Sequence, residues 1–246
     1  MPTETILITG ASSDIGCALI SQLLSRPEPP LILAHSFSSG ERLRALKTQF
    51  SDNIQLFEAD FTQAASVSAM ADQIADAYGV PTGIVHLPAL RLNYERFTKF
   101  KWDRFQSDMA VQVQSAVILL QRFLPKMAKL PRARVVFVLS SVVHGVPPKF
   151  MTMYTTVKYA QLGLMRSLAA EYASTPVRIN AISPSMVETQ FLKEIAEVAV
   201  QMSASANPQG RNATPADLLG TIELLLSSAS NYIHGVDIPI AAGSVC

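Results

Sequence analysis

Residues Ile6–Gly16 read Ile-Leu-Ile-Thr-Gly-Ala-Ser-Ser-Asp-Ile-Gly, an apolar run that leads directly into a glycine-bearing turn. Apolar residues then recur at helical spacing, at Ala18, Leu19, Ile20, Leu23 and Leu24. This order predicts a strand, a tight turn and a helix. Such a turn presents backbone N–H groups and a helix N-terminus to an anion, which is the arrangement that holds the pyrophosphate of a dinucleotide.

The rest of the chain continues the alternation of short strands and helices. Strands are expected to begin near Thr5, Leu31, Ile54, Gly83, Arg134, Val177 and Val236. Helices are expected near residues 15–25, 40–50, 63–77, 101–128, 153–173 and 215–227. This pattern predicts an α/β fold, a doubly wound parallel sheet of about seven strands with helices on both faces. No linker, repeat or low-complexity tract divides residues 1–246, so we expect one domain.

A second group of residues points to the chemistry. Tyr154 and Lys158 stand four apart, so on a helix the phenol and the ammonium lie on the same face. A nearby Lys⁺ favours the phenolate, and we expect Lys158 to lower the pKa of Tyr154 from its ordinary value near ~10. Ser140 and Ser141 follow the apolar run Val135–Leu139. At the end of a strand, Ser141 can donate a hydrogen bond to a carbonyl oxygen that becomes alkoxide-like as a hydride arrives.

Taken alone, Tyr-x-x-x-Lys also arises by chance on amphipathic helices, with the lysine solvated. The glycine turn favours the chemical interpretation, because a dinucleotide would supply the hydride that the Tyr154 and Lys158 pair needs. Together these residues predict chemistry on a carbonyl or an alcohol.

Over essentially all of its length the chain resembles the short-chain dehydrogenase/reductase family, and within it the 3-oxoacyl-[acyl-carrier-protein] reductases. The family's Thr-Gly-x3-Gly-x-Gly turn corresponds to Thr9, Gly10, Asp14 and Gly16, and its Ser, Tyr and Lys to Ser141, Tyr154 and Lys158. Arg178–Pro184 followed by Thr189 resembles the segment that binds the nicotinamide carboxamide. Ile233-His234-Gly235 with Gly243 resembles the C-terminal strand and tail.

The resemblance implies a Rossmann fold, catalysis by Ser141, Tyr154 and Lys158, and a mobile substrate lid at about residues 185–215. The cofactor-binding residues that it implies are Gly10, Ser12, Ser13, Asp14, Ile15, Gly16, His35, Ser36, Asp60, Phe61, Pro88, Ala89, Tyr154, Lys158, Pro184, Val187 and Thr189.

Two departures from the family pattern fall in the cofactor site. Asp14 replaces the middle glycine of the turn, and its carboxylate either caps the first helix or repels the pyrophosphate; we expect the cap. His86-Leu87-Pro88-Ala89 replaces the family's Asn-Asn-Ala-Gly. Pro88 removes a backbone donor and alters the wall of the adenosine pocket. We expect His86 to be a packed strand-end residue rather than an acid or base.

The third departure concerns proton transfer. The resemblance implies a fourth catalytic residue, an Asn in the middle of a long helix that helps to position a proton-relay water, and Gln112 stands at this position. Glutamine keeps the amide but is one methylene longer, and a misplacement near 1 Å can cost ~100-fold in rate. Either catalysis survives with a repositioned relay, or the site is weakened and the chain serves as a partner subunit.

Cofactor preference is read at the end of the second strand. An acid about twenty residues after the glycine turn would bind a ribose 2′-hydroxyl and repel a 2′-phosphate, and none is present. His35, Ser36, Ser38 and Arg42 could accommodate a phosphate, so we expect NADPH. Ser13 stands where NADPH enzymes of this kind carry a basic residue, which keeps NADH as the less favoured alternative.

Substrate contacts are expected from His144, Met151, Met186 and Phe191. An apolar, methionine-containing rim suits an alkyl chain, although these side chains could instead pack on one another. The resemblance also places Arg132 at one of two basic positions that face an acidic acyl carrier, while Thr175 occupies the other.

Composition is typical of a globular α/β domain. The 246 residues are 49% hydrophobic and 16% charged, and the net charge of +1 gives no strong field for nucleic acid or a membrane surface. Two cysteines cannot build a disulfide framework, and no signal peptide or membrane span is predicted, so we expect a cytoplasmic protein. The scattered histidines and cysteines lack ligand spacing, and we expect no metal. The resemblance implies a homo-oligomer, a dimer or tetramer that pairs the helices at 101–128 and 153–173.

These residues and the resemblance together predict the NADPH-dependent reduction of a ketone. The resemblance implies that the preferred substrate is a 3-oxoacyl thioester, bound to an acyl-carrier protein, of fatty-acid or polyketide synthesis. A small free ketone or secondary alcohol is the alternative substrate. A weakly active or non-catalytic subunit that partners a related reductase or synthase is the alternative role.

Overall fold

The computed structural model describes residues 4–38, 40–92, 94–193 and 195–245. Its centre is a seven-stranded sheet of order β3-β2-β1-β4-β5-β6-β7, in which each neighbouring pair is parallel. The strands are β1 (Thr5–Thr9), β2 (Leu31–Ser36), β3 (Ile54–Glu58), β4 (Gly83–His86), β5 (Ala133–Val138), β6 (Val177–Pro184) and β7 (Asp237–Ile240). The predicted doubly wound parallel sheet is confirmed, and the strand positions agree with those expected.

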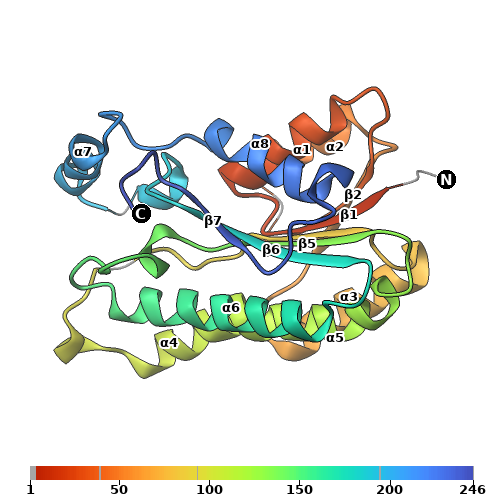
Figure 1. The fold of residues 1–246 in the computed structure, drawn as a ribbon, viewed down its shortest axis with the longest axis horizontal. Helices are drawn as coiled ribbons and strands as arrows, with labels where there is room; N and C mark the ends of the chain where they lie inside the picture. Colours follow the sequence, from red (N-terminus) through yellow and green to blue (C-terminus); the bar gives the residue numbers. More distant parts are fainter. Residues whose placement is uncertain (1–3, 39, 93, 194, 246) are drawn as a thin grey trace.

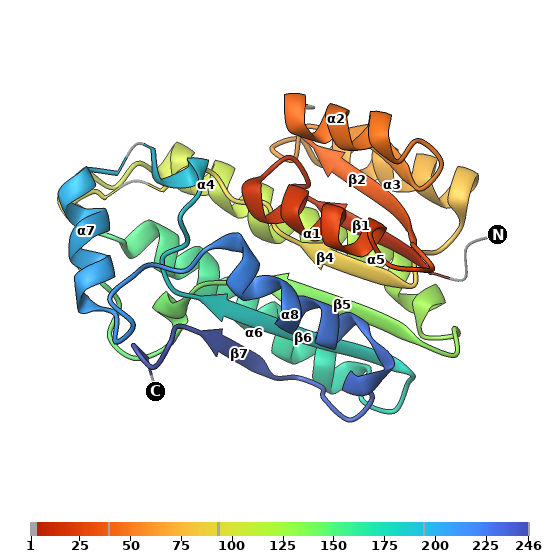
Figure 2. The same ribbon diagram turned by 90° about the horizontal axis from the view of Figure 1, so that it is seen from above.

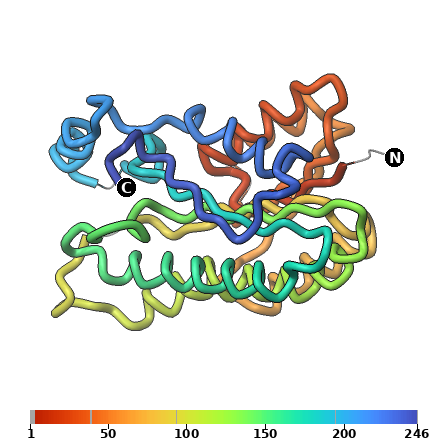
Figure 3. Tube along the Cα trace, in the orientation of Figure 1, coloured from red at the N-terminus to blue at the C-terminus, as the bar shows by residue number. Residues whose placement is uncertain are grey.

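Helices cover both faces of this sheet (Figures 1 and 3). One layer holds α1 (Asp14–Leu24), α2 (Glu41–Gln49) and α8 (Pro215–Leu226), and the other holds α3 (Ala64–Tyr78), α5 (Ser115–Met127) and α6 (Thr152–Glu171). Successive residues of β1 point to opposite layers: Ile6 and Ile8 pack with α1 and α8, while Leu7 packs with α3, α5 and α6. A strand buried on both faces is continuously apolar, which explains the uninterrupted apolar runs of the sequence.

The β1–α1 turn is built by Ser13 rather than by Asp14. Ser13 is the N-cap of α1: its Oγ accepts a hydrogen bond from the N–H of Gly16 at 3.1 Å and donates one to the carbonyl of Gly10 at 2.8 Å. The expectation that Asp14 caps this helix is therefore wrong. Asp14 is the first helical residue, one position after the cap, and its carboxylate is free for other partners.

At position 16 only glycine lets the start of α1 approach the main chain of Ala11 this closely. A Cβ added at Gly16 would lie 2.6 Å from the carbonyl oxygen of Ala11. We expect Gly16→Ala to push α1 away from the turn and to lower the free energy of unfolding by about 1–3 kcal/mol, measured by denaturant titration. Gly220→Ala is the matched control, because a Cβ there meets nothing within 4 Å, and that variant should gain about 0.5–1 kcal/mol. Equal stability of the two variants would contradict the assignment of a steric role to Gly16.

The long helix expected at residues 101–128 is interrupted. The structure shows α4 (Trp102–Met109), then a π-helical turn over Ala110–Gln114, then α5. A π-helical turn displaces the ordinary i→i−4 pairing and leaves a main-chain carbonyl available to side-chain donors. The carbonyl of Gln112 is used in this way: Nε2 of His86 and Nε2 of Gln161 both donate to it at 3.0 Å.

The segment expected to form the lid carries some regular structure. It contains a short 3₁₀ turn at Gln190–Leu192 and α7 (Glu197–Ala206). Its base is tied to the start of α8, because Val187 and Ala213 form a parallel bridge. Figure 2 shows α7 beyond the carboxyl ends of β5 and β6, away from the body of the sheet.

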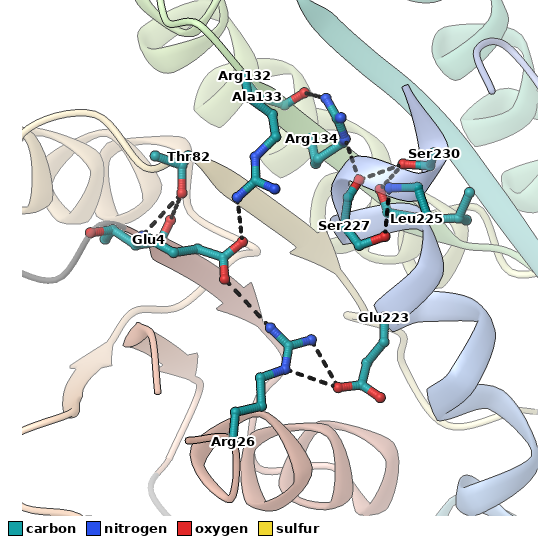
Figure 4. A network of polar contacts seen from close by, with 12 residues as sticks. Glu4, Arg26, Thr82, Arg132, Ala133, Arg134, Glu223, Leu225, Ser227 and Ser230 are labelled. Carbon is teal, nitrogen blue, oxygen red and sulfur yellow. Dashed lines mark hydrogen bonds and ion pairs between the residues drawn. The ribbon is translucent and has the colours of Figure 1, made fainter. Parts of the chain in front are cut away.

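The amino edge of the sheet is held by charged side chains. Arg26 and Arg132 each approach the Glu4 carboxylate at 3.4 Å, and Arg26 also pairs with Glu223 of α8 at 2.8 Å (Figure 4). The buried guanidinium of Arg134 donates to the carbonyls of Ala133 and Ser227. This edge lies opposite to the carboxyl ends of the strands, so the Arg132 expected to face an acyl carrier does not lie beside a site built at those ends.

In the described part of the chain no helix is both long and apolar enough to cross a membrane. Within the same residues, no three His, Cys, Asp or Glu side chains gather as metal ligands. Cys246 falls outside the described residues, and Cys17 is a buried free thiol.

Candidate active site

One cavity of about 900 Å³ opens at the carboxyl ends of the strands. Its walls come from the β1–α1 turn, the loops after β3, β4 and β5, the start of α6, and the lid. In open α/β sheets, ligands bind at this edge, where the winding of the chain reverses. Here the reversal falls between β1 and β4, directly under the cavity. Its size is in the range of cofactor and substrate sites.

The cavity gathers most of the predicted site residues. Those that line it are Gly10, Ser12, Ser13, Asp14, Ile15, His35, Asp60, Phe61, Pro88, Ala89, Ser141, Met151, Tyr154, Lys158, Pro184, Met186, Val187, Thr189 and Phe191. Four predicted residues are not in its wall: Gly16, Ser36, His144 and Gln112. Gly16 shapes the turn from behind, Ser36 is buried at the end of β2, and the other two have different partners.

Tyr154 is a protonated phenol in this structure. Burial raises its pKa to about 12, the nearby Asp108 and Tyr94 act in the same direction, and the hydrogen bond to Ser140 opposes them. The expectation that Lys158 lowers the pKa of Tyr154 is therefore wrong, because loss of solvent outweighs any attraction by the ammonium. At neutral pH Tyr154 consequently carries the proton that a reduction consumes.

Lys158 lies beside Tyr154, with Nζ 5.7 Å from the centre of the phenol ring. It is 2% exposed, and Nζ donates to the Val138 carbonyl at 3.1 Å and to Oε1 of Gln161 at 3.0 Å. Both acceptors are neutral, and burial lowers the pKa of Lys158 to about 7 although Asp108 partly opposes the shift. Lys158 is thus poised between its charged and uncharged forms near neutral pH.

The serine that contacts Tyr154 is Ser140. Its side chain is hydrogen-bonded to the phenol, whereas Ser141 lines the cavity as the first residue of a short 3₁₀ turn. Both serines follow β5 and face the same cavity. A sequence pattern that names one serine of an adjacent pair does not specify which hydroxyl the turn aims at the phenol.

Gln112 does not present its side chain to the cavity. Its Nε2 donates to Asp108 at 3.2 Å, and its Oε1 is buried without a hydrogen-bond partner among the described residues. The side chain therefore bonds within its own helical segment, and the predicted part of Gln112 in a proton relay stays a prediction. What Gln112 contributes near Lys158 is its main-chain carbonyl, freed by the π-helical turn.

His86 is confirmed as a packed strand-end residue. It is 2% exposed, its Nε2–H donates to the Gln112 carbonyl, and its Nδ1 accepts from Thr9 Oγ1 at 2.9 Å. Burial lowers its pKa to about 3, so the imidazole is neutral. It fixes the π-helical turn against the end of β4.

His35 is also a neutral ring rather than a cation for a phosphate. It stacks on Phe61 with centroids 3.7 Å apart and planes 2° apart. Its Nδ1 accepts from the N–H of Gly10 at 3.3 Å, its Nε2 donates to the Ala59 carbonyl at 3.1 Å, and burial lowers its pKa to about 4. The expectation that His35 and Ser36 accommodate a phosphate is not supported, since Ser36 is buried and lies outside the cavity wall.

Asp14 makes a bridge that the sequence did not reveal. Its Oδ1 accepts from Arg42 at 2.6 Å, and its Oδ2 accepts from the main-chain N–H of Gln190 in the lid at 2.7 Å. All three residues line the cavity. One carboxylate therefore joins the glycine turn, α2 and the lid, and it takes hydrogen bonds that an anionic ligand would otherwise accept.

The wall of the cavity also carries apolar side chains. Met151, Met186 and Phe191 line it as expected, and the structure adds apolar residues that the sequence did not single out: Leu90, Leu92, Val142 and Leu192. His144 is not among them, because its Nε2 lies 2.9 Å from the buried carboxylate of Asp237, which also accepts from Ser183. The expectation of a substrate contact by His144 is wrong.

Some site residues carried no signal in the sequence. Gln190 acts through its main chain, Tyr94 belongs to the long loop after β4, and Asp108 of α4 acts on the pKa of Tyr154. The sequence predicts that Arg42 accommodates a phosphate, but it does not predict the pairing with Asp14, which depends on how α2 packs against α1.

Residues 10–244 match the family model described as enoyl-(acyl carrier protein) reductase. With this match, and with the fold and cavity above, the chain belongs to the short-chain dehydrogenase/reductase family.

Among its relatives, the chain is 26% identical to the 3-oxoacyl-[acyl-carrier-protein] reductase of Thermotoga maritima, over 98% of each chain. It is 28% identical to a 2-(R)-hydroxypropyl-CoM dehydrogenase of Xanthobacter autotrophicus, over 95% of each chain. A solved structure of ElxO with NADP bound superimposes with a TM-score of 0.86 at 22% identity, over 98% of each chain. At this identity the structural likeness shows the fold alone.

Proposed function

We propose that this protein is an NADPH-dependent ketoreductase whose preferred substrate is a 3-oxoacyl thioester of fatty-acid or polyketide-type synthesis. The observation that carries the proposal is one continuous cavity that is lined by the β1–α1 turn, by Tyr154 with Lys158, and by the apolar side chains of Met151, Met186 and Phe191. The similarity to the Thermotoga maritima reductase supports the substrate class. A small free ketone remains the second candidate, which the dehydrogenase relative supports.

The residues present fit a dinucleotide. The N-terminus of α1 faces the cavity through Ser12, Ser13 and Ile15, and Asp60 lies in the wall after β3. Arg42, in the first turn of α2, lines the cavity and would supply the positive charge for a 2′-phosphate, which favours NADPH. The bound cofactor would supply a hydride to the carbonyl carbon. NADP is the ligand in the structure of ElxO.

Tyr154 would donate its O–H proton to the carbonyl oxygen, so that the ketone becomes an alcohol. Ser140, bonded to the phenol, would orient the hydroxyl, and Ser141 would hold the substrate oxygen. Lys158 would fix the cofactor ribose and adjust the field around Tyr154. A homodimer or homotetramer that pairs α5 and α6 of neighbouring copies completes the proposal.

Calorimetric titration with NADPH and NADH tests the cofactor part. We expect NADPH to bind at least about tenfold more tightly, because a charge-assisted hydrogen bond from Arg42 to the 2′-phosphate contributes about 1.5–3 kcal/mol. Arg42→Ala should abolish the preference for NADPH over NADH, while Arg44→Ala on the same helix should retain it. If neither nucleotide binds, the reductase proposal fails and the role of a partner subunit gains support. Consumption of NADPH with acetoacetyl-CoA, compared with small free ketones, then tests the substrate class.

A further inference from the structure

A chain of buried hydrogen bonds links Lys158 to the π-helical turn. Nζ of Lys158 donates to Oε1 of Gln161 at 3.0 Å, and Nε2 of the same amide donates to the Gln112 carbonyl at 3.0 Å. Gln161 is 0% exposed, as is Gln112. One glutamine amide therefore spans the whole distance between the ammonium and the π-helical turn.

The direction of each bond is fixed by chemistry. The Gln112 carbonyl can only accept, so the Gln161 amide must present Nε2–H to it and turn its oxygen to Lys158. His86 donates to the same carbonyl and thereby fills its second lone pair. The N–H and the C=O of a carboxamide are distinct groups. This chain of hydrogen bonds therefore binds the Lys158 ammonium but does not carry a proton away from Lys158.

We propose that Gln161 is a positioning residue for Lys158, holding Nζ beside the Tyr154 ring. This rests on the proposed function for its link to catalysis. It differs from the role expected for Gln112, because the amide that approaches Lys158 comes from α6 and not from the α4–α5 helix.

Three titratable groups surround Lys158 and affect its pKa or lie beside it. Asp108 of α4 acts on it from one side, Tyr154 lies one turn earlier on α6, and the neutral His86 ring approaches from β4. Among these groups Asp108 is the acid, and burial raises its own pKa. Burial lowers the pKa of Lys158 to about 7, and the neutral oxygen of Gln161 adds no negative charge to oppose this shift.

Two variants of similar size should move Lys158 in opposite directions. Gln161→Glu places a carboxylate against Nζ and should raise the pKa of Lys158 by at least about one unit. Gln161→Met removes the acceptor without opening a large cavity and should lower it further. Leu162→Met, on the adjacent buried position of α6, is the packing control and should leave the Lys158 titration as in the wild type.

The experiment is an NMR pH titration of the whole protein labelled at its lysine side chains, with the Lys158 signal assigned by its loss in Lys158→Arg. Opposite shifts in the two Gln161 variants, with no shift in Leu162→Met, support the proposal. Shifts in the same direction, or titrations equal to that of the wild type, overturn it. A mere packing role for Gln161 would not reverse sign between Glu and Met.

The pH profile of ketone reduction then separates the two proposals. If activity requires charged Lys158, its alkaline limb should move up in Gln161→Glu and down in Gln161→Met. Shifted NMR titrations without any ketone reduction would refute the proposed function and leave the positioning role intact. Reduction by all variants with an unchanged pH profile and unchanged titrations would refute the positioning role and leave the function intact.

Discussion

Tyr154→Phe should lower kcat for ketone reduction by about 100- to 10,000-fold, the range expected when a general acid is lost. The substitution removes the Tyr154 hydroxyl, which interacts with Ser140 and is protonated at neutral pH because burial raises its pKa to about 12. The ring itself remains, so the packing against Lys158 and the walls of the cavity are kept. Initial rates of NADPH oxidation at saturating substrate measure the effect.

Tyr159→Phe is the matched control for this variant. Tyr159 lies on the same helix, α6, but is 44% exposed and is not part of the cavity wall. Its kcat should stay within about twofold of the wild type, since exposed substitutions away from the site have small effects. NADPH binding should be similar in both variants. If Tyr154→Phe kept more than a tenth of the wild-type kcat, the assignment of Tyr154 as the proton donor would be refuted.

Asp14→Ala should tighten NADPH binding by about 10- to 100-fold. Like charges about 6 Å apart repel by about 3 kcal/mol at an effective dielectric constant of about 20, and removing the carboxylate relieves this repulsion toward a diphosphate. The variant also frees Arg42 and the N–H of Gln190, which the carboxylate now occupies. Calorimetric titration of the wild type and the variant gives the difference in Kd.

Asp14→Asn separates charge from hydrogen bonding. Its side-chain oxygen can still accept from Gln190, so the lid contact is kept while the charge is lost. We expect this variant to bind NADPH with an affinity between those of the wild type and Asp14→Ala. Weaker binding in both variants would show instead that Asp14 prepares Arg42 and the lid for the cofactor.

The fold could be read from the sequence because its signals are local and repeated. Ile6–Ile8 and Val135–Leu139 are apolar without interruption, as strands buried on both faces must be, and the glycines at the first turn have steric reasons visible in the structure. The positions of Tyr154 and Lys158 on one helix followed from their spacing alone.

The predictions from the sequence were wrong where burial or tertiary packing determines the role of a residue. The spacing of residues in the sequence cannot reveal that burial raises the pKa of Tyr154. Nor can it reveal that the side-chain amide near Lys158 belongs to Gln161 and not to Gln112. The role of Asp14 depends on Arg42 and Gln190, which are far from it in sequence. Ser13, one residue before Asp14, is the N-cap because its backbone is extended and its hydroxyl accepts from the N–H of Gly16.

The ion pairs around Glu4 and the candidate active site lie at opposite ends of the same strands. Arg26, Arg132 and Glu223 tie β1, β5, α1 and α8 together at the amino edge, while the cavity opens at the carboxyl edge. For protein engineering this separation is practical. Heat resistance can be sought by redesigning the charges around Glu4, and new substrate preferences by redesigning the lid, in independent libraries whose best variants should combine additively because distant sites seldom interact.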